Sequence, residues 1–479
     1  MADIVLATIN AKWIHPSLAL RLLHANLGPL ADRSRILEFA LRQPLAEKVE
    51  PILEERPRLL ALSVYIWNHE ATLALLEALE RQWAGADGVS GRAGGSHPRP
   101  VIVLGGPEVA YLPEDAPLVG KADWIVRGEG EQIFRALSEH LLLGEPLEHL
   151  ETYGTVSGKW VTAKPLNLTE ITSPYHLYTE EDIEKKLIYV EASRGCPFGC
   201  EFCLSSLDRR VREFPLDHFL QDMEQLMARG ARSFKFLDRT FNLDYTRAEQ
   251  ILRFFLERIK PPGYVHFEMV PSRFPDRLRV LLQEFPAGTL RLEVGIQTFT
   301  PEVARRIGRP SNPEKEQEAL RFLREKTHAI VHADLIAGLP GETLESFAKS
   351  FNELWAVRPT EIQLGILKKL PGTPIARHDG PFAMQYDQRP PYEVQETGSF
   401  SRTELEDVKN FARFWELIIN RGHFDDLLPR LVPERGDAFG IFMDLSRYLK
   451  QRFGKNWGID RSSLRQALEN WIQLKAGLV

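Results

Sequence analysis

The chain has 479 residues, of which 43% are hydrophobic and 26% are charged, and its formal net charge is −6. This length exceeds one ordinary hydrophobic core, so two or three domains are expected. The charge balance gives no general electrostatic attraction to nucleic acid, which argues against nucleic acid as a partner. No apolar run approaches the roughly 20 residues that span a bilayer, and the amino-terminal stretch does not resemble a secretory signal. The sequence therefore predicts a cytoplasmic protein with no membrane partner.

Residues 1–150 alternate strand patterns with helix patterns. Strands that alternate with helices predict an α/β domain with a parallel sheet covered on both faces, the doubly wound, Rossmann-like arrangement. A Gly-, Ser- and Pro-rich segment at 85–100 predicts a mobile surface loop. We expect the strands at 4–9, 36–40, 59–65, 101–104 and 124–126, and the helices at 17–27, 46–55, 70–83 and 131–143.

Residues 151–186 predict a linker with a hairpin that turns at Ser157 and Gly158. A second strand–helix series follows at 187–390, and its six units predict a partial (β/α)6 barrel, shorter than the eight units of a complete one. We expect its strands at 187–192, 233–237, 265–269, 290–296, 329–336 and 361–364. The helices are expected at 216–229, 246–259, 276–285, 301–307, 313–326 and 344–357.

Residues 391–479 predict a mostly α-helical domain, in which no further strands are expected. It opens on a capping box, in which Ser401 begins a helix and Glu404 follows three residues later. These helices are expected to cover the mouth of the barrel. Its predicted core residues are Trp415, Phe424, Phe439, Phe442 and Trp457.

The chain has three cysteines, Cys196, Cys200 and Cys203, and all lie in the string SRGCPFGCEFC. An odd number packed this tightly is no disulfide framework, whereas thiolates suit zinc or iron–sulfur clusters. A structural zinc site or an electron-carrier cluster normally needs four ligands. Three ligands on a four-iron cubane leave one iron open to a substrate. The cysteines follow the first barrel strand, and this architecture builds its active sites at such strand ends.

The Cys-x3-Cys-x2-Cys spacing, with aromatic Phe202 before the third cysteine, resembles the signature of the radical S-adenosylmethionine (SAM) superfamily. The resemblance implies a [4Fe–4S] cluster on Cys196, Cys200 and Cys203 whose open iron chelates SAM. It further implies reductive cleavage of SAM to methionine and a 5′-deoxyadenosyl radical. An electron donor such as flavodoxin or ferredoxin is implied as a partner.

Further strings resemble SAM-binding segments of this superfamily. They are FLD at the end of the second barrel strand, LEVGIQTF at the fourth and HADLIAGLPGET at the fifth. Many relatives have two acidic residues in the first segment, whereas this chain has Arg239 in the second place. Any one of these polar residues could instead cap a strand end, and their recurrence at successive strands favours the SAM role. The residues that the resemblance assigns to SAM are Phe202, Asp238, Glu268, Gln297, Arg309, Asp334 and Gly338.

In the amino-terminal domain, GGPEV and VRGEGE follow two predicted strands and resemble the cobalamin-binding domain that precedes many radical SAM cores. No Gly-x-Gly-x-x-Gly opens the first helix, which argues against a dinucleotide site. The chain lacks the Asp-x-His-x-x-Gly string that supplies the lower cobalt ligand in the classical corrinoid pattern, and His15 and His69 read more readily as loop surface residues. A degenerate domain kept for packing is the alternative. The residues assigned to cobalamin are Asn10, Lys12, His15, Ser63, Tyr65, Trp67, Gly105, Gly106, Pro107, Glu108, Gly128 and Glu129.

Together the resemblances imply a cobalamin-dependent radical SAM enzyme, most commonly one that methylates an unactivated carbon. Relatives with the same cofactors perform rearrangement, cyclisation or oxidation, and a non-catalytic metal-binding protein is the alternative of another class. A methylthiotransferase would need three further cysteines near the amino terminus, and none exists. The substrate is expected to be a small molecule or a peptide of unknown identity.

Overall fold

The computed structural model describes residues 1–84, 98–433 and 436–476, so most of the predicted loop at 85–100 lies outside the described residues. The chain divides into two units, each built from several segments. Unit 1 comprises Met1–Ala192, Arg212–Lys235 and Leu370–Gly372. Unit 2 comprises Ser193–Val211, Phe236–Lys369 and Thr373–Val479.

Unit 1 contains a seven-stranded sheet with the order β2-β1-β3-β4-β5-β7-β6. The neighbours from β2 to β7 pair in parallel, and β6 and β7 are antiparallel. The chain leaves β1 for β2 on one side and returns to β3 on the other, so the strand order switches between β1 and β3. The strands are β1 (Ile4–Asn10), β2 (Ser34–Ala40), β3 (Leu59–Ser63), β4 (Val101–Gly105), β5 (Trp124–Arg127), β6 (Gly154–Ser157) and β7 (Trp160–Ala163).

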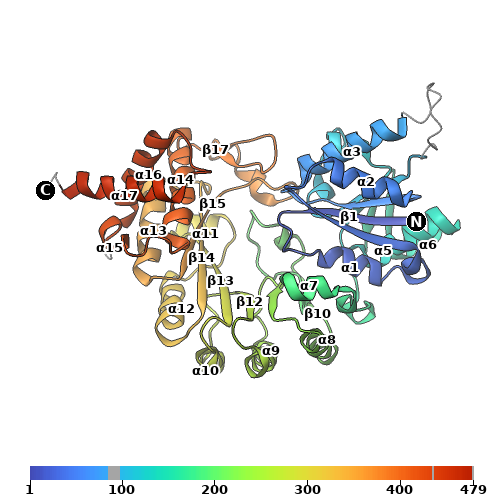
Figure 1. Cartoon of the computed structure of the whole chain (residues 1–479), viewed down its shortest axis with the longest axis horizontal. Coiled ribbons are helices and arrows are strands. Elements are labelled where there is room, and N and C mark those ends of the chain that lie inside the picture. The colour runs from blue at the N-terminus through green and yellow to red at the C-terminus, as the bar shows by residue number, and fades with distance from the viewer. Residues whose placement is uncertain (85–97, 434–435, 477–479) are drawn as a thin grey trace. The chain divides into compact units, whose positions relative to one another are not determined.

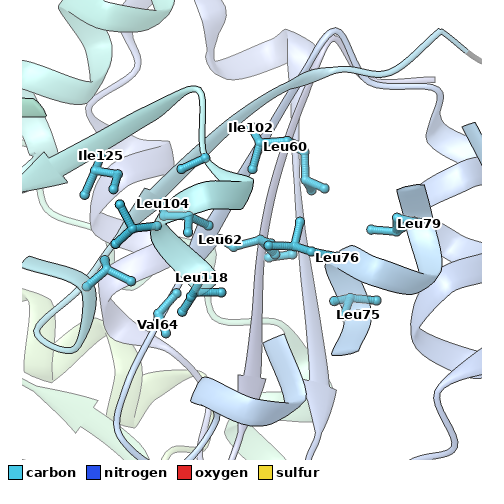
Figure 2. Close-up of a cluster of buried hydrophobic side chains, with 14 of the residues drawn as sticks. Leu60, Leu62, Val64, Leu75, Leu76, Leu79, Ile102, Leu104, Leu118 and Ile125 are labelled. Atoms are coloured by element: carbon cyan, nitrogen blue, oxygen red, sulfur yellow. The ribbon is translucent and has the colours of Figure 1, made fainter. Parts of the chain in front are cut away.

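Helices cover both faces of this sheet, which explains why its strands are apolar runs rather than alternating patterns. One core joins Leu60, Leu62 and Leu104 to Leu75 and Leu76 of α3 (Figure 2). A second core packs the side chains of α1 and α5 against the other face of the sheet, and Figure 1 shows the ribbons of these two helices. The helices are α1 (Leu18–Ala25), α2 (Ala46–Glu55), α3 (His69–Ala84), α4 (Pro117–Lys121), α5 (Gly130–Leu143) and α6 (Leu147–Tyr153).

The predicted hairpin forms between β6 and β7, and Gly158 takes a left-handed φ of 57° in its turn. Its strand β7 pairs with β5, so the hairpin completes the first sheet instead of lying in a separate connection. The rest of unit 1 consists of α7 (Glu180–Lys185), β8 (Ile188–Val190), β10 (Arg212–Glu213), α8 (Leu216–Ala228) and β11 (Ser233–Phe236), whose last residue belongs to unit 2.

Unit 2 contains β12 to β15 of a six-stranded sheet with the order β15-β14-β13-β12-β11-β8, the predicted partial barrel. In β13 every second side chain is buried, and the alternate ones, Arg291, Glu293 and Gln297, form a polar face. The elements are β9 (Ser193–Arg194), β12 (Tyr264–Met269), β13 (Leu290–Gln297), β14 (Ile330–Ala337), β15 (Glu361–Ile366), α9 (Tyr245–Arg258), α10 (Asp276–Glu284), α11 (Pro301–Arg306), α12 (Pro313–Lys326) and α13 (Leu344–Val357).

The carboxy-terminal part of unit 2 is mostly helical, and the predicted capping box of Ser401 and Glu404 begins α14. Phe411 stacks on Trp415 with ring centroids 5.7 Å apart. Two predictions are wrong: Trp457 is 68% exposed because it lies in a turn between helices, and one short strand, at Val394–Glu396, forms in the segment where no strand was expected. The elements are β16 (Gln385–Tyr386), β17 (Val394–Glu396), α14 (Arg402–Trp415), α15 (Leu428–Leu431), α16 (Ala438–Phe453) and α17 (Arg461–Ala476). The predicted α/β fold class is confirmed.

Candidate functional site

The three cysteines lie in one loop of unit 2 that follows β9. Cys200 is buried, and Cys196 and Cys203 are half-buried. The Cys203 N–H donates to the Cys200 carbonyl oxygen at 3.1 Å. Burial raises the pKa of the Cys196 thiol, and the nearby Cys203 and Cys200 thiols raise it further. The thiols are thus close enough to influence one another electrostatically.

The loop around the cysteines, residues 195–203, depends on glycine where backbones approach closely. Gly195 has a φ of +92°, and a Cβ there would lie 2.0 Å from the Arg210 carbonyl oxygen. A Cβ on Gly308, whose φ is +67°, would lie 2.5 Å from the Gly199 carbonyl oxygen. Only glycine meets both the left-handed conformation and the contact without strain, so these positions fix the path of the cysteine loop.

Glu201, between the second and third cysteines, ties this loop to the carboxy-terminal part of unit 2. Its buried carboxylate accepts hydrogen bonds from Arg377 Nε at 2.8 Å and pairs with His378 Nε2 at 2.8 Å. Its N–H donates to the Ile307 carbonyl oxygen at 2.9 Å. A buried carboxylate needs such partners to offset its desolvation, so Glu201 holds the loop in place.

Two arginines supply positive charge beside the thiols. Arg309 Nη1 lies 3.9 Å from Cys200 Sγ, while its Nε donates to the Ile296 carbonyl oxygen at 3.1 Å. Burial raises the pKa of Cys200, and Arg309 lowers it. Arg239, where relatives often have a second acidic residue, also lowers the pKa of Cys196. Nearby cations favour the thiolate, the form that binds metal.

The carboxyl ends of the barrel strands carry the other polar residues predicted for the site. Asp238 is only 2% exposed, and the Ser193 hydroxyl donates to its Oδ1 at 2.6 Å. Arg239 Nη1 donates to Glu268 Oε1 at 3.2 Å. Asp334 is half-buried and lies within β14 (Ile330–Ala337) rather than at its end, and Phe202 is half-buried in the cysteine loop. The positions of Asp238, Arg239 and Glu268 follow from parallel strands, whose carboxyl ends meet at one edge of a sheet.

Gln297 ends β13 in a left-handed conformation with a φ of 70°. The register with β14 shifts between Gly295 and Gln297, which marks a bulge. A non-glycine residue costs energy in this conformation, and such strain is concentrated at functional sites. The strained backbone is therefore a second indication of a functional role for Gln297, independent of the sequence pattern.

The GLPGET string forms the loop after β14. Gly338 is buried with a φ of +82°, and a Cβ there would lie 2.6 Å from Val394 Cγ1. Glu342 is fully buried, and its Oε2 accepts the N–H groups of Gly338 and Leu339 at 3.0 and 3.4 Å. Burial raises the pKa of Glu342 to about 8. Glu342 thus organises the loop that contains Gly338.

In unit 1 the loops after β1 and β3 flank the point where the strand order switches, the usual ligand site of this fold. Tyr65 and Trp67 stack with centroids 4.4 Å apart and planes at 7°. Trp67 and Trp13 are 46% and 49% exposed. Asn68 is fully buried, and its Nδ2 donates to the Ile9 carbonyl oxygen at 3.0 Å, linking the two loops. Exposed aromatic faces beside such a switch suit a flat, largely apolar ligand.

The GGPE loop after β4 packs closely on β3. Gly106 has a φ of +105°, and a Cβ there would lie 2.5 Å from the Val64 carbonyl oxygen. Pro107 is exposed, whereas Glu108 is buried and pairs with His69 Nδ1 at 2.7 Å. His69 is therefore a buried helix-start residue and not the loop surface residue that the sequence suggested.

The remaining residues predicted for unit 1 occupy the same strand ends. Asn10 Nδ2 donates to Glu38 Oε1 at 3.0 Å, and His15 Nδ1 lies 3.0 Å from the Tyr189 hydroxyl. Burial lowers the pKa of His15, as do Lys12 and Lys235. Lys12 and Gly128 are exposed. Ser63 is the last residue of β3, and Gly105 is the last residue of β4. Glu129 forms an ion pair with Arg212 at 2.6 Å.

Each unit fits the cofactor that its motifs imply. In a [4Fe–4S] cubane each thiolate binds a different iron, and the three thiols share one loop beside a cation. Among the described residues, no three His, Cys, Asp or Glu side chains lie close enough together to hold a single metal ion. In unit 1, exposed aromatic rings and close-packed glycine loops surround the switch. Sequence reasoning missed Asn68, Glu201 and Arg377, whose roles arise from long-range partners.

Comparisons with known families match three stretches of the chain. Residues 190–354 match the radical SAM superfamily, and residues 4–138 match the B12 binding domain. Residues 380–477 match a protein family of unknown function, DUF4080. The radical SAM match implies a [4Fe–4S] cluster and SAM, and the B12 match implies cobalamin. None of the helices in the described part of the chain has the length and apolarity needed to cross a membrane.

Similar proteins include an uncharacterized methyltransferase, PH0819 of Pyrococcus horikoshii, which is 29% identical over 57% of this chain and 61% of its own length. The ribosomal protein uS12 methylthiotransferase RimO of Wolinella succinogenes is 24% identical over 40% of the chain and 45% of its own length. The chain thus spans less than two thirds of the length of each of these relatives.

Two solved structures share the fold. The radical SAM methyltransferase TsrM of Kitasatospora setae, with cobalamin and a [4Fe–4S] cluster bound, has a TM-score of 0.58 at 19% identity over 81% of this chain and 78% of its own. The cobalamin-dependent SAM radical enzyme OxsB has a TM-score of 0.63 at 14% identity over 99% of this chain and 75% of its own. This chain thus contains a B12 binding domain at residues 4–138 and a radical SAM domain at residues 190–354, and the cysteine loop lies in the radical SAM domain.

Proposed function

We propose that this radical SAM enzyme methylates an unactivated carbon of a small-molecule or peptide substrate. The observation that carries the proposal is the cysteine loop: the chain has three thiols and no fourth, so the cluster they hold keeps one iron open for SAM. The similarity to PH0819, an uncharacterized methyltransferase, and to TsrM, a radical SAM methyltransferase, supports the methylating form of the chemistry. When bound, the cluster and cobalamin supply electron transfer and methyl transfer.

In this proposal the residues of the protein bind and orient the cluster and SAM and shield them from solvent. Cys196, Cys200 and Cys203 hold the cluster, and Arg309 supplies positive charge beside it. The buried carboxylate of Asp238 is the proposed acceptor for the methionyl amine of SAM, since a buried anion favours a cationic partner. The other proposed SAM contacts are Phe202, Glu268, Gln297, Asp334 and Gly338.

The proposed cobalamin contacts lie in unit 1. The stacked rings of Tyr65 and Trp67, together with exposed Trp13, offer apolar cover for a corrin face. Backbone of the Gly105–Gly106 turn offers close approach without side chains. His69 pairs with Glu108, so we do not propose it as a cobalt ligand, whereas burial lowers the pKa of His15, which favours its neutral form.

The test is anaerobic turnover of the reconstituted full chain with cobalamin, SAM and candidate extracts. Product mass spectrometry should show a gain of one methyl group together with 5′-deoxyadenosine and S-adenosylhomocysteine. Cys200→Ser should abolish both nucleoside products, because a cubane with two thiolates is not retained. Formation of 5′-deoxyadenosine without any methylated product would overturn the methylating form of the proposal.

A second candidate is a rearrangement, cyclisation or oxidation with the same cofactors. OxsB favours it, since that protein aligns with 99% of this chain and is described as a radical enzyme rather than a methyltransferase. The same turnover experiment separates the two, because this chemistry changes the substrate mass without adding a methyl group. A reconstituted protein that forms no 5′-deoxyadenosine at all would instead support a non-catalytic metal-binding role.

A further inference from the structure

Three separate segments of unit 2 contact the same short stretch of the cysteine loop, residues 199–201. In the segment that follows the loop, Arg209 Nη2 lies 2.4 Å from where a Cβ on Gly199 would stand. The end of α11 contributes the Ile307 carbonyl oxygen, which accepts the Glu201 N–H. The segment 374–378 contributes the Ile375 N–H, which donates to the Glu201 carbonyl oxygen at 3.1 Å.

Each of these three segments carries an exposed arginine: Arg209, Arg305 and Arg377. Neither Arg209 nor Arg305 has an ion-pair partner within residues 1–84, 98–433 and 436–476. Arg377 pairs with Glu201, yet its side chain is 64% exposed. In a chain whose net charge is −6, three exposed arginines thus lie around the loop that holds its cysteines, and the one carboxylate of the described residues that pairs with them is Glu201 of the loop itself, on Arg377.

A pocket of about 380 Å³ lies within this basic surface. Arg306, one of its lining residues, donates to the Pro340 carbonyl oxygen at 2.5 Å and stacks 4.6 Å from the Phe382 ring centroid. These contacts fix the guanidinium, so part of the basic surface is preorganised. The pocket is lined by Glu302, Arg305, Arg306, Arg377 and His378.

We infer that this surface, formed by Arg209, Arg305, Arg306 and Arg377, is the docking site of an acidic protein that delivers one electron to the cluster. The inference rests on the proposed function, which requires that electron. In the step, the reduced flavin or iron–sulfur centre of the donor loses one electron and the cluster of this chain gains it, with no bond made or broken. A donor docked here lies against the residues that flank Cys200.

The arrangement favours a protein partner over a small anionic substrate. Arginine is enriched at protein interfaces, and opposite charge on two surfaces steers their encounter. A small anion would instead be held by buried donors, since water screens exposed charges. Here three of the four arginines are exposed and come from different segments, an arrangement that fits a broad acidic surface.

The test compares a protein reductant with a chemical one. The reconstituted double variant Arg209→Glu/Arg305→Glu is assayed for 5′-deoxyadenosine with dithionite, and separately with flavodoxin reduced by its NADPH-dependent reductase. We expect the dithionite rate to stay within about twofold of wild type, and the flavodoxin-driven rate to fall about tenfold or more. Arg324→Glu is the control, because it makes the same charge change in the last turn of α12, which precedes β14 and so lies at the opposite edge of the sheet.

The dissociation constant for labelled flavodoxin, measured on protein with and without the cluster, gives a readout besides activity. It should rise about tenfold in the double variant and should rise with salt only in wild type and Arg324→Glu. An unchanged dissociation constant would overturn the inference, as would an equal loss with both reductants, which points to an anionic substrate site. If wild type forms no 5′-deoxyadenosine with dithionite, the proposed function fails while the binding measurement still tests the docking surface.

Discussion

Arg309 Nη1 lies 3.9 Å from Cys200 Sγ, and the same guanidinium is held by the carbonyl oxygen of Ile296. A fixed positive charge beside a thiolate ligand stabilises the more negative, reduced state of a cluster. Arg309 should therefore raise the reduction potential of the [4Fe–4S] centre.

We expect Arg309→Gln to lower this potential by on the order of 50–100 mV, because the charge is removed at close range. Arg309→Lys keeps the charge and loses the paired hydrogen bonds, so its potential should fall less. Redox titration followed by electron paramagnetic resonance measures both. Equal shifts in the two variants would show that the hydrogen bonds, and not the charge, set the potential.

Gln297 combines a strained backbone with a proposed role in binding SAM. Gln297→Gly should raise the free energy of unfolding by about 1 kcal/mol, since glycine adopts the left-handed conformation freely. Gln297→Ala keeps the strain and gains no stability. Both variants should weaken SAM binding about tenfold, as each loses the side-chain amide. Calorimetric titration with SAM and thermal melts provide the measurements, and a weaker affinity in only one variant would contradict the amide role.

The raised pKa of Glu342 predicts that the free energy of unfolding depends on pH. Its pKa is raised from the ordinary 4.5 to about 8 in the folded protein. Between these values the unfolded chain has lost the proton that the folded chain keeps, so stability falls as pH rises from about 4.5 to about 8. In Glu342→Gln this dependence is absent, and the variant should gain up to a few kcal/mol relative to wild type by pH 8. Melting temperatures from pH 5 to 9 test this; a constant difference between the two proteins would contradict it.

Gly106 should tolerate no side chain, because an added Cβ would lie 2.5 Å from the Val64 carbonyl oxygen and φ is +105°. Gly106→Ala should destabilise unit 1 by about 2 kcal/mol or more and reduce cobalamin retention. Gly120→Ala in α4 is the matched control, since a Cβ there meets nothing within 4 Å. The control should keep its cobalamin and gain up to about 1 kcal/mol. Visible absorbance of the purified proteins reports cobalamin content.

The sequence predicted regular elements well where pattern and burial agree. Periodicity placed α12 and α13 at their observed bounds, 313–326 and 344–357, because each has one apolar stripe on an otherwise polar helix. It missed α6, a short helix that starts on Pro146 and has no strong apolar period. Trp457 shows that the size and apolarity of a side chain do not predict burial where no helix or strand holds the residue against the core.

Sequence alone predicts a residue of the candidate site only where the residue belongs to a local sequence motif. The cysteine spacing is a local signal, and so are glycines in strings such as GGPEV. Glu201 reads as an ordinary acidic residue until the fold brings Arg377 and His378 to it from about 176 residues away. Likewise, nothing in the string VGIQT indicates that Gln297 adopts a left-handed backbone, which depends on the bulge between β13 and β14.

The division of the chain into units has a consequence for how the protein is made. The backbone passes from one unit to the other five times, the last at Gly372, so neither unit is a continuous stretch of sequence. About three quarters of the chain must therefore be synthesised before every segment of unit 1 is available, so unit 1 cannot be completed before part of unit 2 exists. Truncation after the B12 binding domain would leave out strands and helices that unit 1 needs. The cysteine loop lies in the first segment of unit 2, Ser193–Val211, which has segments of unit 1 on both sides of it in the sequence, so the loop is synthesised between two parts of unit 1.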